Sequence, residues 1–313
     1  MSRPQVTLRE VGLRDGLQMV PQVLPTDVKL EWIRREHAAG IREIEATSFV
    51  PPKYAPQFLD AEEVVRASLA FPGLDVTAVI LNLRGAERGL AAGAHKLSFV
   101  VSASESHNQR NARRSSAESL ADFEAIAAMR HNTRPSVKLA GGIATAFGCT
   151  IEGSIDEAAV LRIAESYVRC GADELVFGDT VGYAHPTQVR RLLAGARRAF
   201  GDLPLALHLH DTRGLGMANA AAGLDEGVSR FDACLGGLGG CPHAPGATGN
   251  VVMEDLAFLC EAMGFSTGID ISKLLEVRAF AAIQLPDERM PGAIARAGLP
   301  KDFRFHESGS YAS

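Results

Sequence analysis

Two kinds of segment alternate along the whole chain. Short runs of apolar and β-branched residues are each followed by a turn and then by a longer stretch rich in Ala, Leu, Glu and Arg. Short apolar runs bounded by turn residues are typical of buried strands, and the longer stretches have the composition of helices. The predicted strands span residues 5–11, 41–49, 75–80, 96–101, 136–144, 174–179, 204–211 and 230–238.

Helix start and stop signals lie between these predicted strands. The stretch TDVKLEWIRREHAAG opens with Thr26 and ends at Gly40, and SIDEAAVLRIAESYVRCGA opens with Ser154 and reaches Gly171. Ser or Thr followed by early acidic residues starts a helix, and glycine ends one. We therefore expect a helix in each of the two stretches.

Eight strands alternating with helices predict an α/β protein with a (β/α)8 TIM barrel. We expect a single domain over residues 1–313, with the barrel over about 5–275 and a short C-terminal helical extension over about 276–313. A doubly wound open sheet is the rival fold. Its dinucleotide-binding version is disfavoured because no G-x-G-x-x-G follows the first strand.

The overall composition argues against several classes of partner. The chain has 313 residues, 46% of them hydrophobic, which is enough for a large buried core. Lys and Arg number 32 against 37 Asp and Glu, so the net charge is −5, and no long run of one sign occurs. This balance disfavours nucleic acid or an anionic membrane as the main partner. A small anionic substrate needs only a local positive site.

Cysteine usage and the chain start point to the cytoplasm. The cysteines are Cys149, Cys170, Cys234, Cys241 and Cys260. They are scattered and form no CxxC pair, which predicts reduced thiols. No apolar run reaches transmembrane length. The first predicted strand begins within a few residues of Met1, which leaves no room for a targeting segment.

The first stretch with candidate chemistry is REVGLRDGLQ, residues 9–18. It places Arg14 and Asp15 between two glycines at the end of the first predicted strand. A surface turn is one interpretation, because glycines mark turns and charged residues favour water. In a (β/α)8 barrel, however, catalytic residues lie at the carboxyl ends of the strands. Arg14 and Asp15 are therefore candidate site residues, and Gln18 is a candidate substrate contact.

The second stretch is ALHLHDTRGLG, in which His208 and His210 lie two residues apart on a predicted strand. A spacing of two points both imidazoles to the same face of the strand. A single buried histidine is usually a hydrogen-bonded core residue. Two on one face, followed by a glycine-bearing turn, favour metal ligands over a structural role.

The third stretch, GGLGGCPHAPGATGN, follows the last predicted strand and spans residues 236–250. A flexible surface connection is one interpretation of so many glycines and prolines. The alternative is a lid on the catalytic side of the barrel that brings the Cys241 thiol over a ligand. Asn250 ends the loop with a neutral oxygen ligand, and we expect His243 to be solvent-exposed.

Asp15, His208, His210 and Asn250 together offer two imidazoles, a carboxylate and an amide oxygen. This mixed set, without a thiolate, predicts an octahedral Mg²⁺ or Mn²⁺ site with open positions for substrate or water. Zinc would be expected to have a tetrahedral site with fewer oxygen ligands. The four residues are far apart in the sequence, so the predicted metal site depends on the predicted barrel.

Other strand ends supply further candidates. Glu45 and Ser48 close the second strand in EATSF, and Asp179 and Thr180 close the sixth in FGDTVG. Glu45 is expected to orient Arg14 or to hold a metal-bound water, although a solvated strand-end acid is equally consistent with the pattern. Ser48, Asp179 and Thr180 are expected to contact the substrate. The polar stretch SASESHNQRN after the fourth strand is largely explained as a helix cap.

Five motifs together resemble one known family. EVGLRDGLQ, EATSFV, FGDTVG, HLHDTRG and GLGGCPHAPGATGN resemble the 3-hydroxy-3-methylglutaryl-CoA (HMG-CoA) lyases, metal-dependent enzymes built on a TIM barrel. The similarity runs in order from about residue 5 to about residue 275. The resemblance implies that Asp15, His208, His210 and Asn250 are metal ligands. By the same resemblance, Arg14 matches the essential arginine, Cys241 the catalytic loop cysteine, and Glu45 the strand-end acid.

The resemblance also implies a reaction, retro-aldol cleavage of HMG-CoA to acetyl-CoA and acetoacetate. Mg²⁺ or Mn²⁺ would bind the C3 hydroxyl and the distal carboxylate, and His208 or a metal-bound water would take the hydroxyl proton. Arg14 would stabilise the enolate at the thioester oxygen. Cys241 would protonate the enolate carbon, since a thiol is largely protonated at neutral pH. An acyl-CoA substrate and a homodimer are the expected partners.

Some positions depart from the typical lyase pattern. Gly142 stands where family members often carry Tyr, Val176 stands where Ser is common, and Gly292 and Ala293 replace polar residues. Such changes would reshape the acyl pocket. The first alternative is therefore the same chemistry on a related 3-hydroxyacyl-CoA, such as citramalyl-CoA. The others are an acyl-CoA condensing synthase of the same superfamily, which usually carries a long C-terminal extension, and a barrel that only senses a metal or ligand.

Overall fold

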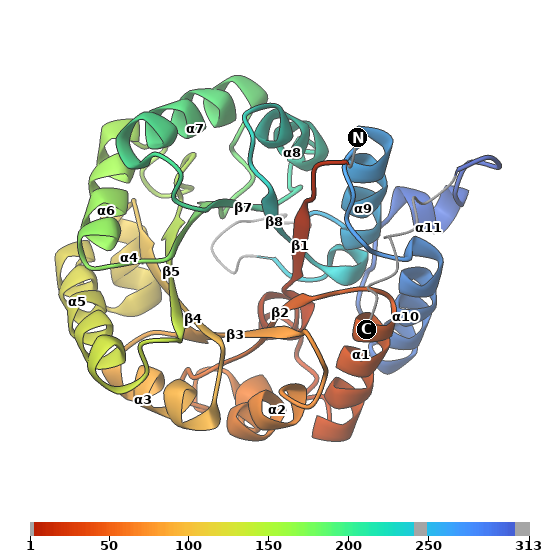
Figure 1. The fold of residues 1–313 in the computed structure, drawn as a ribbon, viewed down its shortest axis with the longest axis horizontal. Helices are drawn as coiled ribbons and strands as arrows, with labels where there is room; N and C mark the ends of the chain where they lie inside the picture. Colours follow the sequence, from red (N-terminus) through yellow and green to blue (C-terminus); the bar gives the residue numbers. More distant parts are fainter. Residues whose placement is uncertain (1–2, 241–248, 304–313) are drawn as a thin grey trace.

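The chain folds into a closed barrel of eight parallel strands surrounded by helices (Figure 1). The structure, a computed structural model, describes residues 3–240 and 249–303. Each strand pairs with the next in sequence, and β8 pairs with β1, so the predicted (β/α)8 barrel is confirmed. The strands are β1 (Thr7–Glu10), β2 (Glu43–Ser48), β3 (Asp75–Ile80), β4 (Lys96–Ser102), β5 (Lys138–Ala144), β6 (Glu174–Asp179), β7 (Leu205–Leu209) and β8 (Arg230–Ala233).

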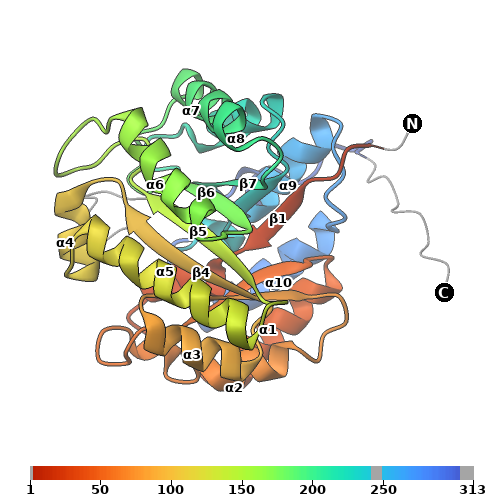
Figure 2. The ribbon, with the colours of Figure 1, turned by 60° about the vertical axis from the view of Figure 1, so that its left-hand side comes forward.

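Helices cover the outside of the barrel, as Figures 1 and 2 show from two directions. They are α1 (Thr26–Ala38), α2 (Ala61–Ser68), α3 (Leu83–Ala92), α4 (Glu105–Ala112), α5 (Ser116–Thr133), α6 (Glu157–Arg169), α7 (Pro186–Phe200), α8 (Gly216–Asp225), α9 (Met253–Ala262), α10 (Ile271–Gln284) and α11 (Ala293–Ala297). Helix α10 packs against α1 beside the barrel. The domain boundary near residue 275 stays a prediction.

Two helix starts differ in detail from the sequence-based expectation. Helix α6 begins at Glu157, and its cap is Asp156, whose carboxylate accepts the N–H of Ala158 at 3.1 Å, not Ser154. Helix α1 begins at Thr26, but the residue before it is Pro25, and no side chain caps this helix. Proline has the backbone angle that a helix start needs, so the helix begins there without a polar cap.

The eighth strand is shorter than predicted. It ends at Ala233, and residues Leu235–Gly237 form a single 3₁₀ turn, η3. Gly236 and Gly237 have φ angles of +62° and +66°, a region that side chains other than glycine rarely adopt. The glycine pair therefore turns the chain out of the barrel wall at the end where the cavity lies.

A closed ring of alternating charge fills the barrel interior at the amino ends of the strands. The first residues of the four even-numbered strands form it: Glu43, Lys96, Glu174 and Arg230. Nζ of Lys96 lies 3.1 Å from Glu43 and 2.9 Å from Glu174. Arg230 lies 3.3 Å from Glu174 and also contacts Glu43. Alternate strands supply each layer of a TIM-barrel interior, and here that layer is ionic.

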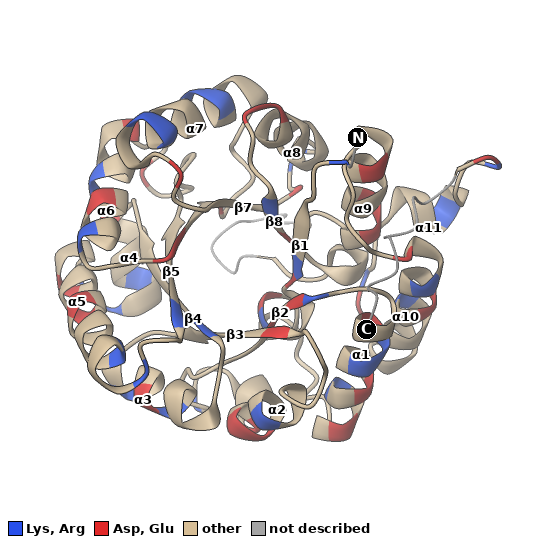
Figure 3. Cartoon of the chain, viewed as in Figure 1, with Lys and Arg blue, Asp and Glu red and all other residues tan. Residues whose placement is uncertain are grey.

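The outer surface carries both signs of charge. Figure 3 shows Lys and Arg interspersed with Asp and Glu over the helices that surround the barrel. Within residues 3–240 and 249–303, no helix combines the length and the apolar character needed to cross a membrane.

The charged ring leads to a stability prediction for Lys96, which is 1% exposed. Lys96→Met is expected to lower the free energy of unfolding by about 3–5 kcal/mol, because it removes one of the two ring cations that the buried carboxylates of Glu43 and Glu174 share. Urea-induced unfolding measures this change.

Lys138→Met is the matched control. Lys138 is the partner of Lys96 in the β4–β5 register, but it is exposed. Its substitution is expected to leave the urea midpoint nearly unchanged. Equal midpoints for the two variants would contradict a stabilising role of the ring.

Candidate active site

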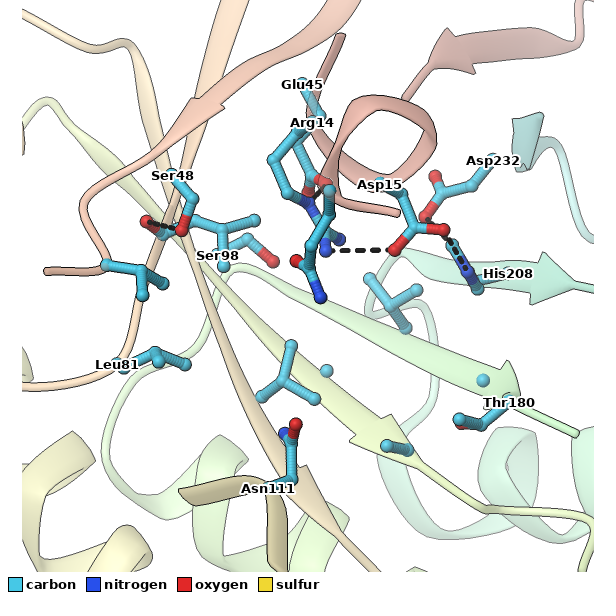
Figure 4. A pocket seen from close by; sticks show the side chains of 18 of the residues that line it. Arg14, Asp15, Glu45, Ser48, Leu81, Ser98, Asn111, Thr180, His208 and Asp232 are labelled. Carbon is cyan, nitrogen blue, oxygen red and sulfur yellow. Dashed lines mark hydrogen bonds and ion pairs between the residues drawn. The ribbon is translucent and has the colours of Figure 1, made fainter. Parts of the chain in front are cut away.

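A cavity of about 280 Å³ opens at the carboxyl ends of the strands (Figure 4). Charged and imidazole side chains line the half formed by β1, β2, β7, β8 and their following turns: Arg14, Asp15, Glu45, His208, His210 and Asp232. The half formed by β3 to β6 is mostly apolar, with Val79, Leu81, Val100, Gly142 and Val176. A ligand that fits both halves has one end rich in oxygen and one apolar end.

The stretch after β1 places Arg14 and Asp15 on a single turn of π-helix, η1 (Gly12–Gly16). Glu10 holds this turn, since its buried carboxylate accepts the N–H of Gly12 at 2.7 Å and that of Leu235 at 3.1 Å. A Cβ atom at position 12 would lie 2.6 Å from that carboxylate oxygen. Glycine is therefore required there by close approach, and Glu10 ties the turn to the end of β8.

Arg14 connects two carboxylates at the rim of the cavity. Its Nε donates to Glu45, and its Nη1 donates to Asp15 Oδ1 at 2.9 Å. Burial alone would raise the pKa of Asp15, but Arg14, His208 and His210 outweigh burial and lower it to about 2. Asp15 is therefore ionised at neutral pH.

The two histidines of β7 and its following turn face each other across a short gap. Their Nε2 atoms lie 3.1 Å apart, and each lies 3.9 Å from Asp15 Oδ2. Burial and the neighbouring His208 lower the pKa of His210 to about 4, so His210 is neutral at pH 7. Asp15, His208 and His210 could together hold a metal ion, since one ligand atom from each lies within 4.8 Å of the others.

Asn250 reaches the same place from the end of the glycine-rich loop, opposite His210 in an isolated β-bridge. Its amide nitrogen donates to Asp15 Oδ2 at 2.7 Å and to the carbonyl oxygen of Leu238 at 3.2 Å. The amide oxygen is buried without a hydrogen-bond partner. A half-turn of the amide would exchange the two atoms and bring this oxygen beside Asp15.

Asp232 is a site residue that the sequence reasoning missed. It lies in the middle of β8 beside His208, and its Oδ2 is 3.1 Å from His208 Nδ1. Arg9, another missed residue, lies 2.7 Å from Oδ1 of Asp232. The sequence signal was available, because Asp232 and Arg9 are charged residues inside two of the predicted strands.

Of the four residues predicted to contact the substrate, three line the cavity and one holds a turn. Gln18, Ser48 and Thr180 line the cavity. The carboxylate of Asp179 instead accepts the N–H groups of Tyr183 and Ala184 at 2.8 and 3.2 Å, so it holds the turn after β6.

The polar stretch after β4 does more than cap a helix, because it also reaches the cavity. His107 and Asn111 of α4 are among the residues that line it. Cys241 and His243 lie outside the described residues, so the predicted catalytic thiol has no position here.

Comparison with known proteins identifies the family. The model of the HMGL-like family matches residues 5–281. The mitochondrial hydroxymethylglutaryl-CoA lyase of Macaca fascicularis is 39% identical over 88% of this chain and 84% of its own length. Hydroxymethylglutaryl-CoA lyase YngG of Bacillus subtilis is 38% identical over 87% of this chain and 90% of its own length.

Solved structures agree with these relatives. The structure of an HMG-CoA lyase from Acinetobacter baumannii in complex with coenzyme A and 3-methylmalate has a TM-score of 0.90 at 39% identity, over 96% of this chain and 97% of that one. The HMG-CoA lyase of Bacillus subtilis has a TM-score of 0.89 at 35% identity, over 95% and 99%. The family match over most of the length, and the identity to these relatives, show that the chain belongs to the HMGL-like family.

Proposed function

We propose that the chain is a carbon–carbon lyase that cleaves HMG-CoA to acetyl-CoA and acetoacetate. The observation that carries this proposal is the convergence of Arg14, Asp15, His208 and His210 on one cavity in a member of the HMGL-like family. Relatives 39% and 38% identical over most of the chain bear the name of this lyase. The structural relative from Acinetobacter baumannii, in complex with coenzyme A, supports an acyl-CoA substrate.

Asp15, His208, His210 and Asn250 would hold a divalent cation, Mg²⁺ or Mn²⁺. Neighbouring ligands at about 2.1 Å from an octahedral ion lie about 3.0 Å apart, and the two imidazole Nε2 atoms are 3.1 Å apart. Asp15 Oδ2 lies 3.9 Å from each of them, so the three atoms are close enough to share one ion. The unpartnered oxygen of Asn250 would become a further ligand after a half-turn of the amide. When bound, the ion would act as a Lewis acid that orients the substrate and acidifies its C3 hydroxyl.

Arg14 would stabilise the negative charge that develops on the thioester oxygen. Among the described residues, its contacts to Glu45 and Asp15 engage Nε and Nη1, which leaves Nη2 for the substrate. Glu45 would act as a positioning residue, because its contact fixes the plane of the guanidinium. A preorganised cation of this kind lowers the barrier more than it strengthens substrate binding.

Two proton transfers complete the proposed reaction. One takes the proton from the C3 hydroxyl, so that C3 becomes the ketone carbon of acetoacetate and the electron pair of the C2–C3 bond passes to C2. The candidate acceptors are a bound water or, if it does not ligate the cation, His208 Nε2. The other transfer delivers a proton to C2 of the acetyl-CoA enolate, and Cys241 is the proposed donor.

The apolar half of the cavity would receive the C3 substituent of the substrate. Val176 is buried in the barrel interior beside Ala140 and Ala206. A Cβ atom at Gly142 would meet Val100 Cγ2 at 3.0 Å, which places the vacant side-chain position of Gly142 against this apolar wall. The open, apolar wall supports a second candidate function, the same cleavage of a related 3-hydroxyacyl-CoA such as citramalyl-CoA or a longer-branched homologue.

Other properties expected from the sequence stay predictions. They are the homodimer, the cytoplasmic location, the substrate contacts of Gln18, Ser48, Thr180 and Asp179, and the extension after about residue 275.

The cation site leads to a prediction about metal removal. Chelation is expected to abolish acetyl-CoA release from HMG-CoA, and added Mg²⁺ or Mn²⁺ is expected to restore it. His210→Ala should lose metal affinity and keep its unfolding temperature, since His210 lies at the rim and not in the barrel core. Full activity of a verified metal-free preparation would contradict this proposal.

The proposed role of Arg14 predicts a particular kinetic change. Arg14→Gln is expected to lower kcat by about 10²–10³ and to change KM little, because the charge that Arg14 meets develops in the transition state. Metal affinity is the control, since Arg14 also contacts Asp15. An increase in KM at constant kcat would contradict this role and would show that Arg14 contributes to substrate binding instead.

The apolar wall predicts the order of substrates in a comparison of kcat/KM. HMG-CoA is expected to rank first, with a longer-branched homologue within about 10–200-fold, the range that a methylene or two controls. Gly142→Leu should reduce kcat/KM more for the longer homologue than for HMG-CoA. A preference for HMG-CoA of several orders of magnitude would show that Gly142 and Val176 serve packing alone. Citramalyl-CoA ranking first would favour the second candidate function.

A further inference from the structure

Three charged or ionisable side chains stand in one row across neighbouring strands. Arg9 on β1 is the register partner of Asp232 on β8, and Asp232 is the register partner of His208 on β7. All three point into the barrel, where Asp232 accepts from Arg9 Nε at 2.7 Å and lies 3.1 Å from His208 Nδ1. Figure 4 shows the contact between Asp232 and His208 at the edge of the cavity.

Asp232 is held firmly, because both of its oxygens are engaged. Nε and Nη2 of Arg9 each lie 2.7 Å from Oδ1, which leaves Oδ2 for His208. Arg9 is in turn held by Glu174 at 3.0 Å, and Glu174 belongs to the ring of alternating charge. Asp232 is 5% exposed. If the Asp232 carboxylate turned away from His208, the buried Arg9 guanidinium would lose this hydrogen-bond acceptor. The carboxylate is therefore held beside the imidazole.

The contact determines which nitrogen of His208 carries its proton. An ionised carboxylate only accepts hydrogen bonds, so the proton of a neutral His208 must lie on Nδ1. Nε2 then carries the lone pair, and this atom lies 3.1 Å from His210 Nε2. Either proposed role of His208, ligand or proton acceptor, requires that lone pair.

We infer that Asp232, anchored by Arg9, is a positioning residue that holds His208 in the Nδ1–H tautomer and aims its Nε2 lone pair at the proposed cation site. The inference rests on that site. A carboxylate behind a ligating imidazole typically contributes about 10–100-fold to metal affinity.

Asp232→Asn tests this inference with almost no change of shape. Arg9 has only donors, so the single amide oxygen should turn to Arg9, and the amide NH₂ should face His208 Nδ1. The imidazole must then accept at Nδ1 and carry its proton on Nε2, where it blocks a metal. The variant is therefore expected to bind Mn²⁺ about 10–100-fold more weakly, as measured by the electron paramagnetic resonance of free Mn²⁺ in titrations of the whole chain.

Glu174→Gln is the matched control. It also removes a buried negative charge beside Arg9, but glutamine keeps an amide oxygen that can accept from Arg9. Among the described residues, Glu174 contacts Arg9, Lys96 and Arg230 and not His208. Its Mn²⁺ affinity is expected to stay within about threefold of the parent chain. The inference is overturned if Asp232→Asn keeps the parent affinity, or if Glu174→Gln loses as much.

A second measurement does not depend on the Asp232 variant folding. In the Mg²⁺-loaded parent chain with ¹⁵N-labelled histidine, the ring nitrogen spectrum should show the His208 proton on Nδ1, with the signal assigned by its absence in His208→Gln. A proton on Nε2 would overturn the inference. Neither experiment uses a thioester, so failure of the proposed HMG-CoA cleavage would leave both results interpretable.

Discussion

The guanidinium of Arg9 lies inside the barrel between the charged ring and the cavity and contacts residues of both. A buried cation has to be surrounded by acceptors, because an unpaired charge in a low-dielectric interior is very unfavourable. Arg9 meets this requirement with Glu174 on the side of the charged ring and with Asp232 on the side of the cavity. One side chain therefore contacts both the charged ring and the carboxylate behind His208.

Above this ionic layer, the cavity divides according to which strands form its wall. β1, β2, β7 and β8 contribute Arg14, Asp15, Glu45 and the histidines, whereas β3 to β6 contribute small and aliphatic side chains. A thioester with a chelating hydroxy acid at one end and an apolar branch matches this division. The polar half accounts for the proposed chemistry, and the apolar half decides which acyl group fits.

The turns that follow β1 and β8 are far apart along the chain, but hydrogen bonds connect them. Glu10 accepts from Gly12 and Leu235, and Asn250 donates to Asp15, so the turn that carries Arg14 and the ends of the glycine-rich loop are held together. Burial raises the pKa of Glu10 to about 8, although the N–H groups of Leu235 and Gly12 that it accepts lower it.

The sequence by itself determined the barrel and the position of Arg14, Asp15 and the two histidines in its cavity. Strand and helix periodicity are local properties, and a spacing of two assigns His208 and His210 to one face without knowledge of other strands. Only the tertiary structure decided that Asp232 lies behind His208, that Asn250 turns its nitrogen to Asp15, and that Asp179 holds a turn. These contacts depend on the register between β1, β8 and β7 and on how loops close over them. Register between strands distant in the chain is set by the closed barrel as a whole, and no local pattern encodes it.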